Sequence, residues 1–144
     1  MMSSRLVIDA SVALSWAFED EADVLSDRVL DALVDGVVVV PAVWPVEVSN
    51  GLVTAQRRGR ITPAETARFL SLIGRLPVQV ESFELGSMGS LVDAAREYNL
   101  SAYDASYLAL AMSLGAPLAT QDAALQEAAT AAGVELFAGE GTRS

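Results

Sequence analysis

The residues of this chain that could do chemistry are its carboxylates. The sequence has 19 Asp and Glu residues, nine positive charges that are all Arg, and no His, Cys or Lys. The missing residues exclude a Ser/His/Asp triad, the ordinary zinc sites, and the Lys of Schiff-base and P-loop chemistry. A reaction on this chain would therefore depend on Asp, Glu, hydroxyls, amides, Arg and a bound cofactor or metal ion.

Four acids are singled out by their positions along the chain. Asp9 and Asp122 each follow a predicted strand, whereas Glu47 and Asp104 lie near the start of predicted helices. In one parallel sheet all four would fall at the carboxyl edge, where carboxylates repel one another and raise each other's pKa values unless a cation binds them. Oxygen ligands of this kind select Mg²⁺ or Mn²⁺. Such a site supports phosphodiester hydrolysis by metal-bound water, a reaction that needs no His.

Each of these acids also has a purely structural interpretation. Asp9 and Asp122 could be the N-caps of the helices that follow them. Ser101 and Asp104 have the spacing of a capping box, with Asp in place of the preferred Glu or Gln. Glu47 could be a solvated residue in a first turn, where the helix dipole favours acids. Taken singly, each acid is better explained in this way than by a site.

The local settings of the acids favour a site. Glu47, Asn50 and Thr54 form a polar line on an otherwise apolar helix, because residues three or four apart share a helix face. Asp104 begins an apolar segment that looks buried, and an acid in a core needs a partner or a metal ion. Ser11, two residues after Asp9, could orient a metal-bound water or bond to the backbone.

Strand and helix patterns alternate along the chain and must position these acids. The β-branched run Val37–Val40 is typical of a strand buried on both faces, and Thr62 with Glu65 has the capping-box spacing that opens a helix. The alternation predicts an α/β fold, a three-layer α/β/α sandwich with a central parallel sheet. No linker or repeat divides the sequence, so we expect a single domain over residues 1–144. The expected strands cover residues 6–8, 37–40, 78–80, 118–120 and 134–137, and the expected helices cover 11–18, 22–34, 45–58, 63–76, 90–98, 103–114 and 123–132.

The bulk composition limits the partners and the location. A net charge of −10 argues against diffuse binding of nucleic acid, which needs a basic surface. The local exception is a cluster of Arg57, Arg58 and Arg60. We find no signal peptide and no apolar segment long enough for a membrane span, so the expected location is cytoplasmic and no membrane partner is expected.

Four segments of the chain resemble PIN domains, and more closely the VapC-type toxins of VapBC toxin–antitoxin pairs. They occur in the order found in that family and together extend over nearly the whole chain. Any one of them is a weak pattern, but four at these spacings are specific. The segments are Val7–Leu14, Val46–Leu52, Leu100–Ala111 and Leu118–Asp122.

The resemblance implies a metal-dependent endoribonuclease that acts as the toxin of a type II pair, forms a homodimer and is neutralised by a cognate antitoxin. The implied substrates are transfer or ribosomal RNA, and the implied cofactor is Mg²⁺ or Mn²⁺. The family's acidic residues, which would be both catalytic and metal-binding, fall on Asp9, Glu47, Asp104 and Asp122. Its supporting polar positions fall on Ser11, Asn50 and Thr120.

The chain departs from its relatives in having fewer basic residues near the acids. Many relatives carry a basic residue where this chain has Ser15, and another where it has Ala123 and Ala124. The cluster of Arg57, Arg58 and Arg60 is left as the candidate for RNA binding. A solvated helix end, where positive charge complements the helix dipole, explains the cluster equally well.

Two other functions stay open at this stage. The chain could be a catalytically inactive PIN-like module that binds a basic peptide or protein in an acidic cleft. It could also be a phosphoryl-transfer α/β domain, because receiver domains and aspartate-nucleophile phosphatases end a first strand with Asp. The absence of Lys, and Ser11 where the phosphatase pattern has a second Asp, disfavour that last interpretation.

Overall fold

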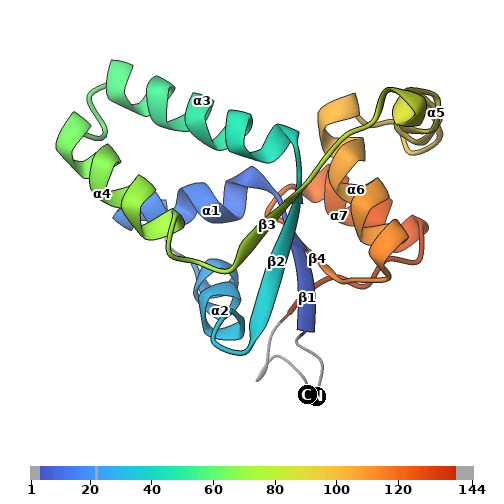
Figure 1. Ribbon diagram of the computed structural model, residues 1–144, viewed down its shortest axis with the longest axis horizontal. Helices are drawn as coiled ribbons and strands as arrows, with labels where there is room; N and C mark the ends of the chain where they lie inside the picture. The colour runs from blue at the N-terminus through green and yellow to red at the C-terminus, as the bar shows by residue number, and fades with distance from the viewer. Residues whose placement is uncertain (1–3, 22, 139–144) are drawn as a thin grey trace.

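The central sheet determines where the predicted site residues lie. Within residues 4–21 and 23–138, which the computed structural model describes, four parallel strands form one sheet in the order β3-β2-β1-β4 (Figure 1). In the register of the sheet, Val7 of β1 is opposite Val39 of β2 and Leu118 of β4. The strands are β1 (Ser4–Ile8), β2 (Gly36–Pro41), β3 (Val78–Glu81) and β4 (Leu118–Ala119).

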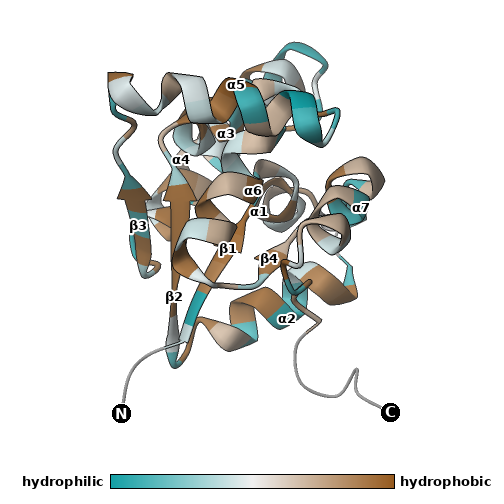
Figure 2. Cartoon of the chain, turned by 90° about the vertical axis from the view of Figure 1, so that its right-hand side faces the viewer, coloured by the Kyte–Doolittle hydropathy of each residue, from teal (hydrophilic) through white to brown (hydrophobic). Residues whose placement is uncertain are grey.

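The two central strands form because their side chains are apolar on both faces. Val7 and Ile8 of β1 and Val38 and Val40 of β2 have no exposed surface, as expected for parallel strands covered by helices on each side. Figure 2 shows these strands in the brown of hydrophobic residues. The edge strand β3 differs, since none of its four residues is fully buried.

Helices cover both faces of the sheet. In Figure 1, helices α1 to α4 lie on one side and α5, α6 and α7 lie on the other, so the predicted three-layer α/β/α fold is confirmed. The described part of the chain contains seven α-helices and two short 3₁₀ helices. They are α1 (Ala10–Ala17), η1 (Glu19–Glu21), α2 (Val24–Ala32), α3 (Val43–Arg57), α4 (Pro63–Ile73), η2 (Leu85–Ser87), α5 (Met88–Glu97), α6 (Ala102–Leu114) and α7 (Ala123–Ala131).

Helix α6 packs against the central strands β1 and β2 beside the site. Its first turn is capped by Ser101, whose hydroxyl accepts from the Asp104 amide at 3.1 Å. Tyr107 and Leu108 are buried against the sheet. The helix ends at Gly115, which has φ of 62°, a left-handed conformation that glycine adopts without strain.

Several predicted elements differ in the structure, among them two helices that begin two residues earlier than expected, at Val43 and Met88. The expected strand over 134–137 is wrong, since only an isolated parallel bridge joins Leu136 to Leu118. The helix that opens at the Thr62 capping box ends at Ile73 and does not reach residue 76, because Gly74 caps it. The helix expected over 22–34 begins at Val24, after the N-cap Asp23. Residue 22 lies outside the described residues.

None of the described helices is both long enough and apolar enough to cross a membrane.

Candidate active site

A cavity of about 600 Å³ lies where the carboxyl ends of the strands meet α3 and α6. All four predicted acids line it, together with Ser11 and Asn50. Its remaining wall is mostly apolar and includes Leu14, Val46, Tyr103 and Tyr107. The structure thus brings together acids that come from four different parts of the sequence, namely Asp9, Glu47, Asp104 and Asp122.

Strand ends and helix starts place two of these acids. Asp9 directly follows β1 and caps α1, since its Oδ1 accepts from the Val12 amide at 3.4 Å. Asp122 follows β4 and caps α7, since its Oδ2 accepts from the Leu125 amide at 2.8 Å. The structural interpretation of both residues is therefore correct, and both also line the cavity.

Asp9 is the most buried of the four acids, with 6% of its surface exposed. Its Oδ1 accepts from the Ser11 hydroxyl at 2.6 Å, and its Oδ2 accepts from the Thr120 hydroxyl. Burial raises the pKa of Asp9, and the hydrogen bonds from Ser11, Thr120 and Val12 oppose that rise. Thr120 therefore lies behind the cavity wall and acts on the cavity through Asp9.

Asp104 shows that the acids share one electrostatic environment. Its pKa is raised first by burial and then by the negative charges of Asp122, Glu47 and Asp9. Each of these carboxylates is close enough to disfavour ionisation of Asp104. A cation in the cavity would relieve this repulsion.

Glu47 is held by a residue that the sequence analysis did not treat as functional. The hydroxyl of Tyr107, on α6, donates to Glu47 Oε1 on α3. Tyr107 is 1% exposed, and its pKa is raised far above the usual range, first by burial and then by the bond to Glu47. The only signal in the sequence is that Tyr107 is three residues after Asp104 and so shares its helix face.

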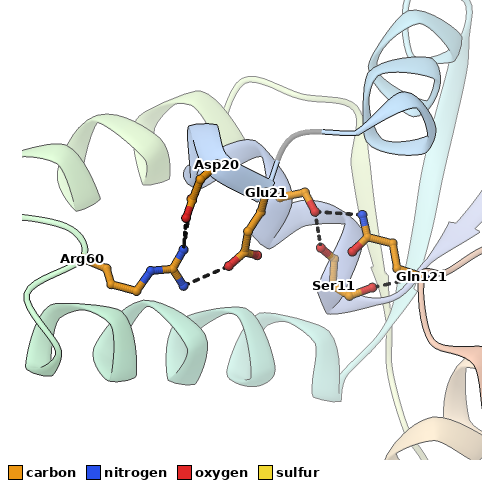
Figure 3. A network of polar contacts seen from close by, with 6 residues as sticks. Ser11, Asp20, Glu21, Arg60 and Gln121 are labelled. Atoms are coloured by element: carbon orange, nitrogen blue, oxygen red, sulfur yellow. Dashed lines mark hydrogen bonds and ion pairs between the residues drawn. The ribbon is translucent and has the colours of Figure 1, made fainter.

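A second polar network lies behind Ser11. The side chain of Gln121 donates from Nε2 to Ser15 Oγ at 2.9 Å and to Asp23 Oδ2 at 2.7 Å. Ser15 Oγ in turn donates to the Ser11 carbonyl at 3.1 Å (Figure 3). The network connects α1, the N-cap of α2 and the segment after β4, so it fixes the loop that carries Thr120 and Asp122.

The three arginines proposed for RNA binding lie outside the cavity lining. Arg60 forms ion pairs with Asp20 at 3.1 Å and with Glu21 at 2.9 Å (Figure 3), and its guanidinium lies 4.5 Å from the centre of the Phe18 ring. It connects the turn after α3 to η1. Arg57 and Arg58 are exposed at the end of α3.

The chemistry of the donor set fits a hard divalent cation. The cavity presents carboxylates and the Asn50 amide, and oxygen is the donor that Mg²⁺ and Mn²⁺ prefer. In the described residues no group of three or more acidic side chains is arranged to hold a metal ion, so the carboxylates would have to turn toward it. Asp9 Oδ2 can bind a cation and keep its bond from the Thr120 hydroxyl, because it has a second lone pair, whereas Oδ1 already accepts from Ser11 and Val12.

The fold and the cavity define an α/β protein with a carboxylate site at the carboxyl ends of parallel strands. The family model that matches the chain is the PIN domain, over residues 6–131. The chain therefore belongs to the PIN domain family. PIN domains are generally nucleases and typically use divalent metal ions, so membership indicates a nuclease.

A solved structure supports the same assignment. The crystal structure of PAE2754 from Pyrobaculum aerophilum is similar to this chain, with a TM-score of 0.66 and 25% sequence identity over 88% of this chain and 87% of that chain. No curated protein matches the chain. The resemblance to PIN domains expected from the sequence is thus confirmed.

Proposed function

We propose that this PIN-domain protein is a Mg²⁺- or Mn²⁺-dependent endoribonuclease that acts as a VapC-type toxin and is neutralised by a cognate antitoxin. The observation that carries the proposal is the gathering of Asp9, Glu47, Asp104 and Asp122 in one cavity, where burial and then the other three acids raise the pKa of Asp104. In a chain with no His or Lys, a metal ion held by carboxylates can supply the nucleophile as bound water. The substrate class we propose is transfer or ribosomal RNA.

The chain's own residues have distinct tasks in this proposal. The four acids would hold the cation, which supplies hydroxide at neutral pH and neutralises charge on the phosphate. Ser11 and Thr120 keep the Asp9 carboxylate in place by donating one hydrogen bond to each of its oxygens. Asn50 brings amide N–H donors to the acid-lined cavity, and we assign it to a phosphate oxygen of the RNA.

Because the protein as a whole is acidic, RNA has to bind through a small basic part of its surface. The net charge of −10 repels phosphate in general, and Arg60 is already paired with two acids. Arg57 and Arg58, exposed at the C-terminal end of α3, are therefore the residues of the arginine cluster that we assign to the RNA backbone.

We also propose that the protein is a homodimer. Residues 80–92, from the edge strand β3 to α5, expose a run of large apolar side chains, and α5 has no buried residue. A surface of this kind is typical of an interface. The exposed residues are Val80, Phe83, Leu85, Met88 and Val92. Light scattering of the purified chain tests the dimer, and a monomer at micromolar concentration would contradict it.

The test of the nuclease is cleavage of transfer and ribosomal RNA with Mg²⁺ or Mn²⁺ by the native chain and by Asp9→Ala and Asp104→Ala. We expect both variants to lose cleavage, while Asp93→Ala, an exposed acid on α5, retains it. Unchanged cleavage in both cavity variants would refute the proposal. If calorimetry shows no divalent binding but shows binding of an Arg-rich peptide, the chain is an inactive PIN-like binding module.

The toxin role is tested separately by co-expression. We expect the product of a neighbouring gene to co-purify with this chain and to suppress its cleavage of RNA. A chain that stays equally active with every neighbouring gene product would rule out the toxin role and leave the nuclease intact.

A further inference from the structure

We propose that Tyr107 is a positioning residue that holds Glu47 in the acidic cavity for cation binding and RNA hydrolysis. The inference rests on the proposed function and adds a residue to it. Tyr107 touches neither the substrate nor the reacting water in this role, because its hydroxyl acts on the Glu47 carboxylate.

Glu47 needs such a partner because of its surroundings. It is half-buried on α3 and faces Asp9, Asp104 and Asp122 across the cavity. These like charges push its carboxylate toward solvent, and a partly exposed Glu side chain has several rotamers to occupy. In the described residues the Tyr107 hydroxyl is the one hydrogen-bond donor to the Glu47 side chain.

Tyr107 is suited to this task because the protein fixes its ring. The side chain is 1% exposed and is part of the hydrophobic core, so the position of its hydroxyl is set by packing. Tyr107 also lines the cavity, which places the hydroxyl at the boundary between the core and the acids. A neutral phenol donates a hydrogen bond there without adding charge.

The bond joins elements that are 60 residues apart in the sequence. Glu47 is on α3 and Tyr107 is on α6, one turn after Asp104. Tyr107 therefore couples the position of Glu47 to the helix that carries Asp104. It occupies Oε1 of Glu47 and leaves Oε2 for the cation.

The test compares Tyr107→Phe, Glu47→Gln and the double variant by Mn²⁺ calorimetry, RNA cleavage and thermal unfolding. Phe fills the same space and leaves no unpaired hydroxyl, and water can hydrogen-bond to the half-buried Glu47 carboxylate in its place, so we expect a smaller change in Tm than for a variant that unpairs a fully buried carboxylate. Loss of an outer-shell partner of a metal ligand lowers affinity or activity about 10–100-fold, and we expect a loss in this range for Mn²⁺ affinity and for kcat. Because Tyr107 acts through Glu47, the double variant should be no worse than Glu47→Gln alone.

Tyr98→Phe is the matched control, since it removes a phenol at the end of α5 outside the cavity lining and should leave both readouts unchanged. A Tyr107→Phe variant that binds Mn²⁺ and cleaves RNA like the native chain overturns this inference and leaves the nuclease standing. Losses that multiply in the double variant also overturn it. A native chain that neither binds Mn²⁺ nor cleaves RNA overturns the proposed function and this inference together.

Discussion

Replacing Thr120 with Val should destabilise the protein by about 2 kcal/mol at neutral pH, because hydrogen bonds to charged groups contribute about 1.5–3 kcal/mol. Thr120 is 2% exposed. Its hydroxyl donates to Asp9 Oδ2 and accepts from the Asp122 amide at 3.0 Å. Val has nearly the same shape but no hydroxyl, so it leaves the buried carboxylate without one of its partners. For a domain of this size the expected fall in Tm is about 6 °C.

The destabilisation should depend on pH. Burial raises the pKa of Asp9 above its ordinary value of 3.8. Between that value and the raised one the folded state binds more protons than the unfolded state, so stability falls as the pH rises through this window. The Thr120 hydroxyl lowers the pKa of Asp9 and thus limits the effect. In Thr120→Val, which lacks this hydroxyl, the full destabilisation is therefore expected at pH values where Asp9 is ionised. The destabilisation should become smaller in acid, where Asp9 is protonated.

Urea unfolding of the native chain and of Thr120→Val at neutral pH and in mild acid measures both parts of this prediction. Thr130→Val is the control, because Thr130 is exposed and its hydroxyl donates to the Gln126 carbonyl within α7 at 3.1 Å. We expect little change in its free energy of unfolding. The reasoning about Asp9 would be refuted if Thr120→Val cost no more than Thr130→Val, or if its cost were the same at both pH values.

Three further predictions concern the cavity, the packing and the arginines. Asp104→Asn should raise the Tm at neutral pH without divalent cations, because burial and then the neighbouring acids raise the pKa of Asp104. The gain should vanish toward pH 3.8, and a lower Tm would contradict this. Gly36→Ala should destabilise by about 1–3 kcal/mol, since a Cβ there would lie 2.9 Å from a carbonyl of β1. By contrast, Gly89→Ala in α5, where a Cβ meets nothing within 4 Å, should stabilise by about 0.5–1 kcal/mol in the same assay. Arg60→Ala should lower the Tm, less so in high salt, and leave RNA affinity in filter binding unchanged. Arg57→Ala should lower RNA affinity and leave the Tm unchanged.

Local patterns were enough to predict most of the fold. The β-branched run Val37–Val40 lies within the buried strand β2. The capping box at Thr62 and Glu65 opens α4, with both of its hydrogen bonds formed. The strand predicted over 134–137 failed because its neighbour β4 spans only Leu118–Ala119, so the ladder between them is reduced to bonds on either side of Leu118.

The site could be predicted only as far as each acid's position relative to a strand or helix. Contacts between distant segments have no local pattern. The bond from Tyr107 to Glu47 spans 60 residues, and that from Arg60 to Asp20 spans 40. The arginine cluster looked like one basic group in the sequence, but folding pairs Arg60 with acids of η1.

Asp9 and Asp122 are also helix caps, so the four acids would be under different constraints in a relative that had lost its activity. Stability alone would favour keeping Asp9 and Asp122. A PIN domain that had lost its nuclease activity would still need both caps, since losing one costs about 0.5–2 kcal/mol. Glu47 and Asp104 cap nothing, and Asp104 destabilises its own surroundings when ionised. In an inactive relative of this protein, Glu47 and Asp104 could therefore be replaced without loss of stability. We therefore expect three positions to distinguish active from inactive relatives of this protein: Glu47, Asp104 and Tyr107.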